Sequence, residues 1–383
     1  NVIDIGIVTS PMFYHSTYEL NSSSGVVITG SHNPGNYNGF KIVFNNHSTS
    51  SEEILNLKQR ILEENFREGK GASKKEDIKE SYINRILESI NLNKNLNISI
   101  DCGNGAAGVV AKDVYERLGC NVIELYGELD GSFPNHHPDP SKLENMEDLI
   151  KSVKENDSVV GLAFDGDADR LGVISPKGEM IFPDRQMIMF SRQVIQSSPN
   201  AKIVFDVKCS KLLSDEIEKL KGKPLICKTG HTFIKQKIRE TDALLGGEMS
   251  GHIFFNDRWP GFDDGIYAGA RMLEIIANSE EEDQFVSVPD MLSTPEINIP
   301  SADEEKFQIV KTFIENSEFN NAKIVSIDGI RVEFETGWGL LRASNTSPCL
   351  VLRFEAETND DLNKIKEIFY LGLKSIKPNI NKF

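Results

Sequence analysis

The feature that most constrains the fold of this chain is an alternation of strand-like apolar runs and helix-like segments over most of its 383 residues. Short runs rich in Val and Ile, such as residues 97–101 and 159–164, alternate with helix patterns such as residues 106–118. This order predicts βαβ units, in which helices cover sheets. Because one domain usually takes ~100–150 residues, we expect several such units.

The alternation is interrupted at three places. Residues 67–77 are polar and rich in Gly and Lys, residues 175–179 form a polar turn, and residues 288–300 follow an acidic run. After residue 300, strands come first and one helix, 359–375, comes last, which is the order of an α+β domain. We therefore predict units one to four at residues 1–75, 76–178, 179–290 and 291–383. The expected fold class is α/β with mixed sheets for the first three units and α+β for the fourth.

The charge balance limits the possible partners. The chain has 42 Lys and Arg against 58 Asp and Glu, a net charge of −16. Such a surface has no general attraction for nucleic acid or anionic membranes, and no apolar run approaches the ~20 residues of a membrane span. The five cysteines are scattered and form no CxxC pair, which favours reduced thiols in a cytoplasmic protein. We expect a small-molecule partner, with neither nucleic acid nor membrane.

Three carboxylates follow the apolar run 159–164 directly. Asp165, Asp167 and Asp169 alternate in "DGDADR", and Arg170 comes next. Carboxylates packed this closely repel one another unless a cation or proton intervenes, and their hard oxygens suit Mg²⁺. An acidic surface turn is the alternative, although such turns rarely follow so apolar a strand. An EF-hand is disfavoured because position 12 of its loop would be Pro176 instead of Glu.

Two further loops suit a phosphorylated sugar. In "GGEMSGH", Glu248, Ser250 and His252 alternate, so an extended loop would turn them to one side, where a carboxylate and a hydroxyl suit sugar hydroxyls. In "RASNTSPCLVLR", two arginines and several small donors surround one loop, which is the composition of a phosphate-binding site. Both could instead be ordinary polar turns. The second set is Arg342, Ser344, Asn345, Thr346 and Arg353.

A serine loop follows the apolar run 26–28. It presents Ser31 beside His32, and Lys41 follows ten residues later. The pattern is not GxSxG and no Ser–His–Asp order is evident, so a hydrolase triad is disfavoured. With a triple-Asp loop for Mg²⁺ and a phosphate-binding loop elsewhere, we interpret Ser31 as a carrier of phosphate.

Two patterns point to other chemistry. Residues 103–108 match GxGxxG after a strand, with Glu124 about 20 residues later, which is the formal fingerprint of dinucleotide binding. A tight strand–helix turn explains the same residues equally well. His136 and His137 suggest a metal, but adjacent histidines point in different directions in an extended chain, so we expect a Pro-rich connector.

The four motifs "TGSHNPGNYNGFK", "DGDADR", "GEMSGH" and "RASNTSPCLVLR", in this order, resemble the α-D-phosphohexomutase superfamily. The bacterial phosphomannomutase/phosphoglucomutase group is the most similar, and the resemblance covers essentially the whole chain. It implies three related α/β domains and a TATA-binding-protein-like α+β domain. The family's N-terminal "FGTxGIRG"-type segment is absent, and the first residues already read as a strand. We therefore expect the chain to begin inside domain one and to be impaired in catalysis or folding.

The resemblance also implies roles for single residues. Ser31 would be the phosphorylated serine, Mg²⁺ would be bound by Ser31 and the three aspartates of "DGDADR", and Arg170 would support the transferring phosphate. Lys41, His32 and His252 are candidates for proton transfer and charge stabilisation, and the division among them stays open. The residues implied to bind substrate are Lys208, His231, Glu248, Ser250, His252, Arg342, Ser344, Asn345, Thr346 and Arg353.

The activity that this resemblance implies is interconversion of hexose 1-phosphate and hexose 6-phosphate, of mannose or glucose. Phospho-Ser31 would pass its group to the sugar, and a hexose 1,6-bisphosphate, which also serves as activator, would turn over in the cleft. Met249 and Ala168 occupy positions at which phosphoglucosamine mutases usually have Gln and Gly, so these two residues disfavour that group. Open alternatives are a phosphoglucosamine mutase, a metal-dependent phosphatase, a sugar-phosphate-binding fragment without turnover, and a dehydrogenase. We expect a monomer or weak dimer.

Overall fold

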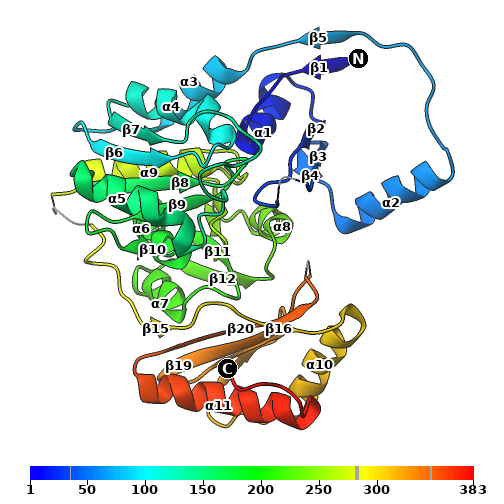
Figure 1. The fold of residues 1–383 in the computed structure, drawn as a ribbon, viewed down its shortest axis with the longest axis vertical. Helices are drawn as coiled ribbons and strands as arrows, with labels where there is room; N and C mark the ends of the chain where they lie inside the picture. Colours follow the sequence, from blue (N-terminus) through cyan, green and yellow to red (C-terminus); the bar gives the residue numbers. More distant parts are fainter. Residues whose placement is uncertain (35, 281–283, 346) are drawn as a thin grey trace.

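The computed structural model describes residues 1–34, 36–280, 284–345 and 347–383, and it has the predicted α/β units followed by an α+β unit (Figure 1). Unit two contains a five-stranded sheet in the order β10-β9-β8-β6-β7. Strands β7, β6 and β8 are parallel, whereas β9 and β10 are antiparallel to their neighbours. Its elements are α3 (Lys79–Ser89), β6 (Asn97–Asp101), α4 (Ala111–Arg117), β7 (Asn121–Leu125), α5 (Glu147–Glu155), β8 (Val160–Phe164), β9 (Leu171–Ile174) and β10 (Met180–Ile181).

Unit three repeats this plan with a four-stranded sheet in the order β12-β11-β13-β14. Its last helix, α9 (Gly265–Ala277), packs against β8 and β9 of unit two. The approach is close: a side chain at Gly269 would meet the Tyr115 hydroxyl at 2.3 Å. One hydrophobic core therefore runs through units one, two and three. The other elements are α6 (Pro183–Ser197), β11 (Lys202–Asp206), α7 (Lys211–Lys219), β12 (Lys223–Cys227), α8 (His231–Thr241), β13 (Leu245–Gly247) and β14 (Ile253–Phe255).

Unit one is less regular than the other α/β units. Its three strands pair antiparallel in the order β2-β3-β4, and β1 pairs in parallel with β5 beyond them (Figure 1). The apolar pattern at residues 3–8 predicts a longer strand than the one observed, because β1 ends at Asp4, whose side chain accepts a hydrogen bond from the Gly6 amide. The elements are β1 (Val2–Asp4), α1 (Ser10–Glu19), β2 (Gly25–Ile28), β3 (Phe40–Phe44), β4 (His47–Ser48), α2 (Ser51–Leu62) and β5 (Ser73–Lys75).

Unit four has its own core. Helices α10 and α11 pack together on one face of an antiparallel sheet in the order β15-β20-β19-β18-β17, with β16 also paired to β20. The opposite face meets unit three through Trp338 and Leu340, which contact Val207. The elements are β15 (Leu292–Ser293), β16 (Ile297–Pro300), α10 (Asp303–Asn316), β17 (Lys323–Val325), β18 (Ile330–Glu333), β19 (Gly337–Ala343), β20 (Cys349–Ala356) and α11 (Asn359–Ile376).

Candidate active site

The loop after β2 lies against the loop after β8, so the predicted serine and aspartates meet between units one and two. Ser31 has a φ of 50° and its amide donates to Thr29 Oγ1 at 2.8 Å, an arrangement that turns the backbone sharply. A side chain at Gly166 would lie 2.2 Å from the Ser31 carbonyl oxygen, so the two loops approach this closely only because residue 166 is glycine.

The Ser31 side chain points into the acidic loop. Its Oγ donates to Asp165 Oδ2 at 2.9 Å and lies 3.1 Å from Nδ1 of His32. Burial and the nearby Arg170 charge lower the pKa of His32 to about 4, so the imidazole is neutral at pH 7. The ring of His137 bonds the His32 carbonyl, which ties this loop to unit two. The structure thus brings Ser31 and His32 together beside the aspartates.

We call Asp165, Asp167 and Asp169 the acidic centre. All three are buried, and one carboxylate oxygen from each lies within 4.8 Å of the others. Lys41 bonds Asp167 at 2.5 Å and also bonds Asp169. Burial and the two neighbouring carboxylates raise the pKa of Asp165 to about 8. Burial would also raise the pKa of Asp167, but Lys41 outweighs it and holds that pKa below its usual range.

The acidic centre fits a divalent cation. Oδ1 of Asp167 and Oδ1 of Asp169 are buried and accept no hydrogen bond from any described residue. Unpaired buried carboxylate oxygens are costly unless a cation satisfies them. An all-oxygen donor set is the chemistry that Mg²⁺ prefers. The donors present therefore suit the predicted Mg²⁺, and Ser31 Oγ is close enough to Asp165 to belong to the same set.

His252 joins this centre from the turn between β13 and β14. Its Nε2 accepts from Arg170 Nε at 3.1 Å, and its Nδ1 lies 3.1 Å from Asp263 Oδ2. Burial opposes protonation of this ring, but Asp169 and Asp263 outweigh burial and raise its pKa. The turn is tighter than the extended loop that we expected, because the Glu248 amide donates to the His252 carbonyl. Arg170 and His252 are thus in direct contact, as a shared site requires.

Asp263 is a site residue that sequence reasoning missed. It is fully buried, accepts from Lys235 Nζ at 2.9 Å and lies 3.4 Å from His231 Nδ1 as well as near His252. The rings of His231 and His252 stack with centroids 5.5 Å apart. The signal available in the sequence was the pair "DD" at the start of α9, whose second member, Asp264, caps that helix. Asp263 therefore lies within ion-pair distance of both histidines.

The sugar-binding residues predicted from "GEMSGH" lie on the same turn. Glu248 is buried, accepts from the Gly230 amide at 2.5 Å and has its pKa raised by burial. Ser250 is half-buried at the turn itself. Asp206 connects this turn to Lys208, because its Oδ1 accepts from the Met249 amide at 3.3 Å and its Oδ2 lies 4.0 Å from Lys208 Nζ. The turn and Lys208 therefore border one region.

We call Lys208, Arg342 and Arg353 the cationic cluster, at the junction of units three and four. Lys208 donates to Glu296 at 2.6 Å, and Arg342 donates to Asp328 at 2.9 Å.

Arg353 reaches the cationic cluster from a strand beside the loop. It lies inside β20 and not on the loop, and its guanidinium bonds Asp184 at 3.2 Å and the Lys208 carbonyl. The register of β19 with β20 turns Arg342 and Arg353 to the same face, toward unit three. Of the loop residues, Ser344 is buried and Asn345 is exposed. Thr346 lies outside the described residues.

The two alternative patterns have structural explanations. The amide of Ala106 donates to the Gly166 carbonyl, and a side chain at Gly108 would collide with the Gly127 carbonyl at 1.9 Å. Backbone therefore fills the position that a pyrophosphate would need beside the glycine loop. His136 bonds Asp101 and His137 bonds the His32 carbonyl, so the two rings do point to different partners. In the part of the chain that the structure describes, no helix is long and apolar enough to cross a membrane.

Four family models describe the chain: phosphoglucomutase/phosphomannomutase alpha/beta/alpha domain I at residues 1–68, domain II at 80–178, domain III at 182–290 and the C-terminal domain at 296–371. A phosphomannomutase/phosphoglucomutase of Pseudomonas syringae pv. tomato is 47% identical over 100% of this chain and 82% of its own length. A phosphoglucosamine mutase of Methanocaldococcus jannaschii is 32% identical over 98% of this chain and 85% of its own.

Solved structures agree with these sequences. The crystal structure of a phosphoglucomutase/phosphomannomutase family protein from Burkholderia thailandensis matches with a TM-score of 0.94 and 41% identity, covering 100% of this chain and 85% of that one. The geometry, the four domain matches and the relatives converge on one conclusion. The chain belongs to the phosphoglucomutase/phosphomannomutase family and is an enzyme of the intramolecular phosphotransferase class.

Proposed function

We propose that this enzyme interconverts the 1-phosphate and 6-phosphate of mannose and glucose, and that Ser31 carries the phosphoryl group. The observation that carries this proposal is the Ser31 hydroxyl, 2.9 Å from Asp165 within a buried group of three carboxylates. A serine at a cation site, with cationic side chains across the junction of units three and four, suits a phosphate at each end of the substrate.

In the first step, a free hydroxyl of the hexose phosphate forms a bond to the phosphorus of phospho-Ser31, and the bond between phosphorus and Oγ breaks. The hydroxyl proton passes to His32, whose ring is neutral at pH 7 and whose Nδ1 lies 3.1 Å from Ser31 Oγ. Ser31 Oγ takes up a proton from water once its bond to phosphorus has broken. Lys41 balances negative charge beside Asp167 and Asp169. The resulting hexose 1,6-bisphosphate turns over, and the second transfer reverses these steps.

Asp165, Asp167, Asp169 and the phosphorylated Ser31 would hold Mg²⁺, which supplies charge neutralisation for the transferring phosphate. Before transfer, the chain itself positions these groups. Asp167 accepts from Ser10, Thr29 and Lys41, so the carboxylate is oriented by three partners from unit one. These bonds bring the serine loop and the aspartate loop together without any substrate.

The remaining subsites set the choice of sugar. We propose that Glu248, Ser250 and His231 contact sugar hydroxyls and that Lys208 with the loop at 342–346 and Arg353 holds the phosphate that does not react. The higher identity to the mannose and glucose relatives, 47% against 32% for the glucosamine relative, favours the former substrates. We further propose a cytoplasmic monomer or weak dimer that is activated by hexose 1,6-bisphosphate.

The test is phosphorus NMR of mannose 1-phosphate with the enzyme, Mg²⁺ and a trace of glucose 1,6-bisphosphate. Mannose 6-phosphate should appear with the native chain and with Ser22→Ala, an exposed serine of the same unit, but not with Ser31→Ala. Turnover by Ser31→Ala would overturn the phosphoserine. Free phosphate as the main product would indicate a phosphatase, and faster conversion of glucosamine 1-phosphate would reassign the sugar.

A further inference from the structure

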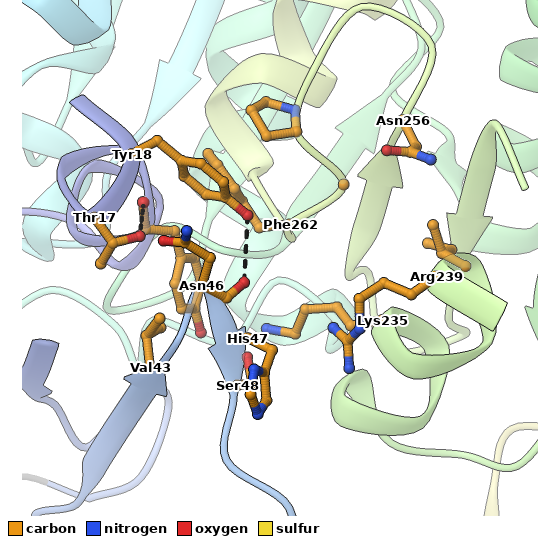
Figure 2. Close-up of a pocket in the computed structure, with 14 residues that line it drawn as sticks. Thr17, Tyr18, Val43, Asn46, His47, Ser48, Lys235, Arg239, Asn256 and Phe262 are labelled. Atoms are coloured by element: carbon orange, nitrogen blue, oxygen red, sulfur yellow. Dashed lines mark hydrogen bonds between the residues drawn. The ribbon is translucent and has the colours of Figure 1, made fainter. Parts of the chain in front are cut away.

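A separate cavity lies between units one and three, and none of the residues that line it is assigned to catalysis. Its volume is about 120 Å³, against a share of about 30 Å³ for one water molecule in the liquid. Helix α1 and the strands β3 and β4 form one side, and α8 with the loop at 256–262 forms the other (Figure 2). It therefore has room for a group larger than a single water molecule.

The lining of this cavity is cationic although the chain is acidic overall. Lys235 and Arg239, one helical turn apart on α8, face the side formed by His47 and Ser48 (Figure 2). None of its lining residues is Asp or Glu, in a chain with a net charge of −16. Within the described residues, Arg239 forms no ion pair with a carboxylate. A concave site whose lining has two cations and no carboxylate favours an anion, although Asp263 lies behind Lys235.

The two cations differ in how they are held. Lys235 is buried, with its Nζ 4.4 Å from the centroid of the Tyr14 ring and one bond to Asp263 at 2.9 Å. An ammonium has three donors, so two remain for a ligand. Arg239 is exposed at the mouth and offers a planar fork that matches an oxyanion. The amides of Asn46 and Asn256 add neutral hydrogen-bonding groups to the lining.

We propose that this cavity binds a small oxyanion, of the phosphate or carboxylate class, between Arg239 and Lys235. The aromatic walls, Tyr14 and Phe262 with ring centroids 5.5 Å apart, exclude water from one side of the ligand and so strengthen these charged hydrogen bonds. The site is independent of the proposed role of Ser31. Lys235 also bonds Asp263, which lies beside His252, so an occupant of the cavity contacts a side chain that supports the active site.

Calorimetric titration with inorganic phosphate, and in a second arm with citrate, tests this site in the full chain. The variant Arg342→Ala, which alters only the cationic cluster, distinguishes phosphate bound in the active site from phosphate bound in the cavity. We expect two classes of phosphate site in the native protein. Arg342→Ala should remove one class. Arg239→Ala should weaken binding at the other by about tenfold or more, which corresponds to the loss of one charged hydrogen bond. Arg85→Ala, an exposed arginine on α3, should bind as the native chain does.

The comparison of the two probes identifies the ligand class. Tighter binding of phosphate than of citrate, with both sensitive to Arg239→Ala, would assign a phosphate group, and the reverse order would assign a carboxylate ligand. Arg239→Lys should recover part of the affinity because the charge returns without the fork. A single class of site that Arg239→Ala leaves unchanged would overturn the proposal. The proposal would also fail if Arg85→Ala weakened phosphate binding as much as Arg239→Ala does.

Discussion

The acidic centre and the cationic cluster are both dense in charge, but they are satisfied differently. Two carboxylate oxygens of the acidic centre have no hydrogen-bond donor among the described residues. In the cationic cluster every cation already has a carboxylate: Lys208 bonds Glu296, Arg342 bonds Asp328 and Arg353 bonds Asp184. The first region therefore has oxygens free for an added cation, whereas under the proposed function a phosphate would enter the second by replacing an anionic partner.

The two regions also differ in where they sit. The acidic centre lies among loops of the units that share one core, and the cationic cluster spans the junction to the separate core of unit four. Exchange of partners at such a junction changes how units three and four are held together, whereas a cation at the acidic centre would act between units one and two. The following variants and conditions separate these behaviours, beginning with the largest effect.

Asp165→Asn should have the largest effect on activity. It removes charge from the acidic centre and weakens the contact to Ser31, so we expect kcat for mannose 1-phosphate to fall by about a thousandfold, as for loss of a main electrostatic group. Asp130→Asn, an exposed carboxylate of unit two, is the control and should keep native activity. A variant at 165 with more than a tenth of native kcat would remove the acidic centre from the mechanism.

Arg353→Met should instead act on stability. It leaves Asp184 buried without its cation, and breaking a buried pair in this way costs about 3–5 kcal/mol of the free energy of unfolding. Urea unfolding followed by circular dichroism measures this loss. The double variant Arg353→Met with Asp184→Asn should recover part of it, because no unpaired charge remains. Equal stability of native and single-variant protein would show that the pair does not hold the junction.

Removal of divalent cations should destabilise the native chain alone. A ligand present at about 100 times its Kd stabilises by about 2.7 kcal/mol, so chelation should lower the melting temperature by a few degrees. Asp169→Asn should melt at the same temperature with and without chelator, because the donor set is incomplete. If neither Mg²⁺ nor chelator changed the melting temperature of the native chain, the acidic centre would not be a cation-binding site.

Arg342→Gln should weaken substrate binding more than it weakens the fold. Its guanidinium pairs with Asp328 on the same unit, and loss of a charged hydrogen bond to phosphate costs about 1.5–3 kcal/mol, or an increase in KM of tenfold or more. Initial rates over a range of mannose 1-phosphate measure KM and kcat separately. A fall in kcat with unchanged KM would place Arg342 at the reacting phosphate and not at the distant one.

Glu296→Gln should give the smallest change in KM. The variant keeps the shape of the side chain but removes the charge that competes with phosphate for Lys208, so KM should fall by a few-fold. Gln at Glu318, an exposed position of unit four, serves as the control. An increase in KM would mean that Glu296 organises Lys208 for the substrate and does not occupy its place.

Local signals in the sequence predicted local structure well. Ser50 and Glu53 have the sequence spacing of a capping box, and they form one at the start of α2. The sequence pattern predicts a helix over residues 51–68, and this end is wrong: the helix stops at Leu62, and Glu64 adopts the left-handed region with a φ of 52°. The apolar face of α2 was correctly periodic, yet Ile54 and Ile61 are exposed, since burial depends on which other elements reach that face.

In the site, too, features set by neighbouring residues could be predicted, whereas features set by residues far apart in the sequence could not. The residues of each motif were predictable because a strand followed by Ser31 or by Asp165 delivers its loop to the sheet edge. Asp263 and Glu296 were missed, because their importance comes from His252 and Lys208, which are distant along the chain or belong to another unit. The inward position of Arg353 depends on the register of two strands, which the loop composition does not reveal.

Helix α9 has a consequence for synthesis of the protein. The strands of unit two are complete at Ile181, but the helix that packs on β8 and β9 ends at Ala277. On the ribosome that face of the sheet waits for about a hundred further residues, which takes roughly 5 to 20 seconds at 5–20 residues per second. Unit two therefore cannot finish folding when its own sequence has emerged, and chaperones that bind apolar sheets have their main opportunity in that interval.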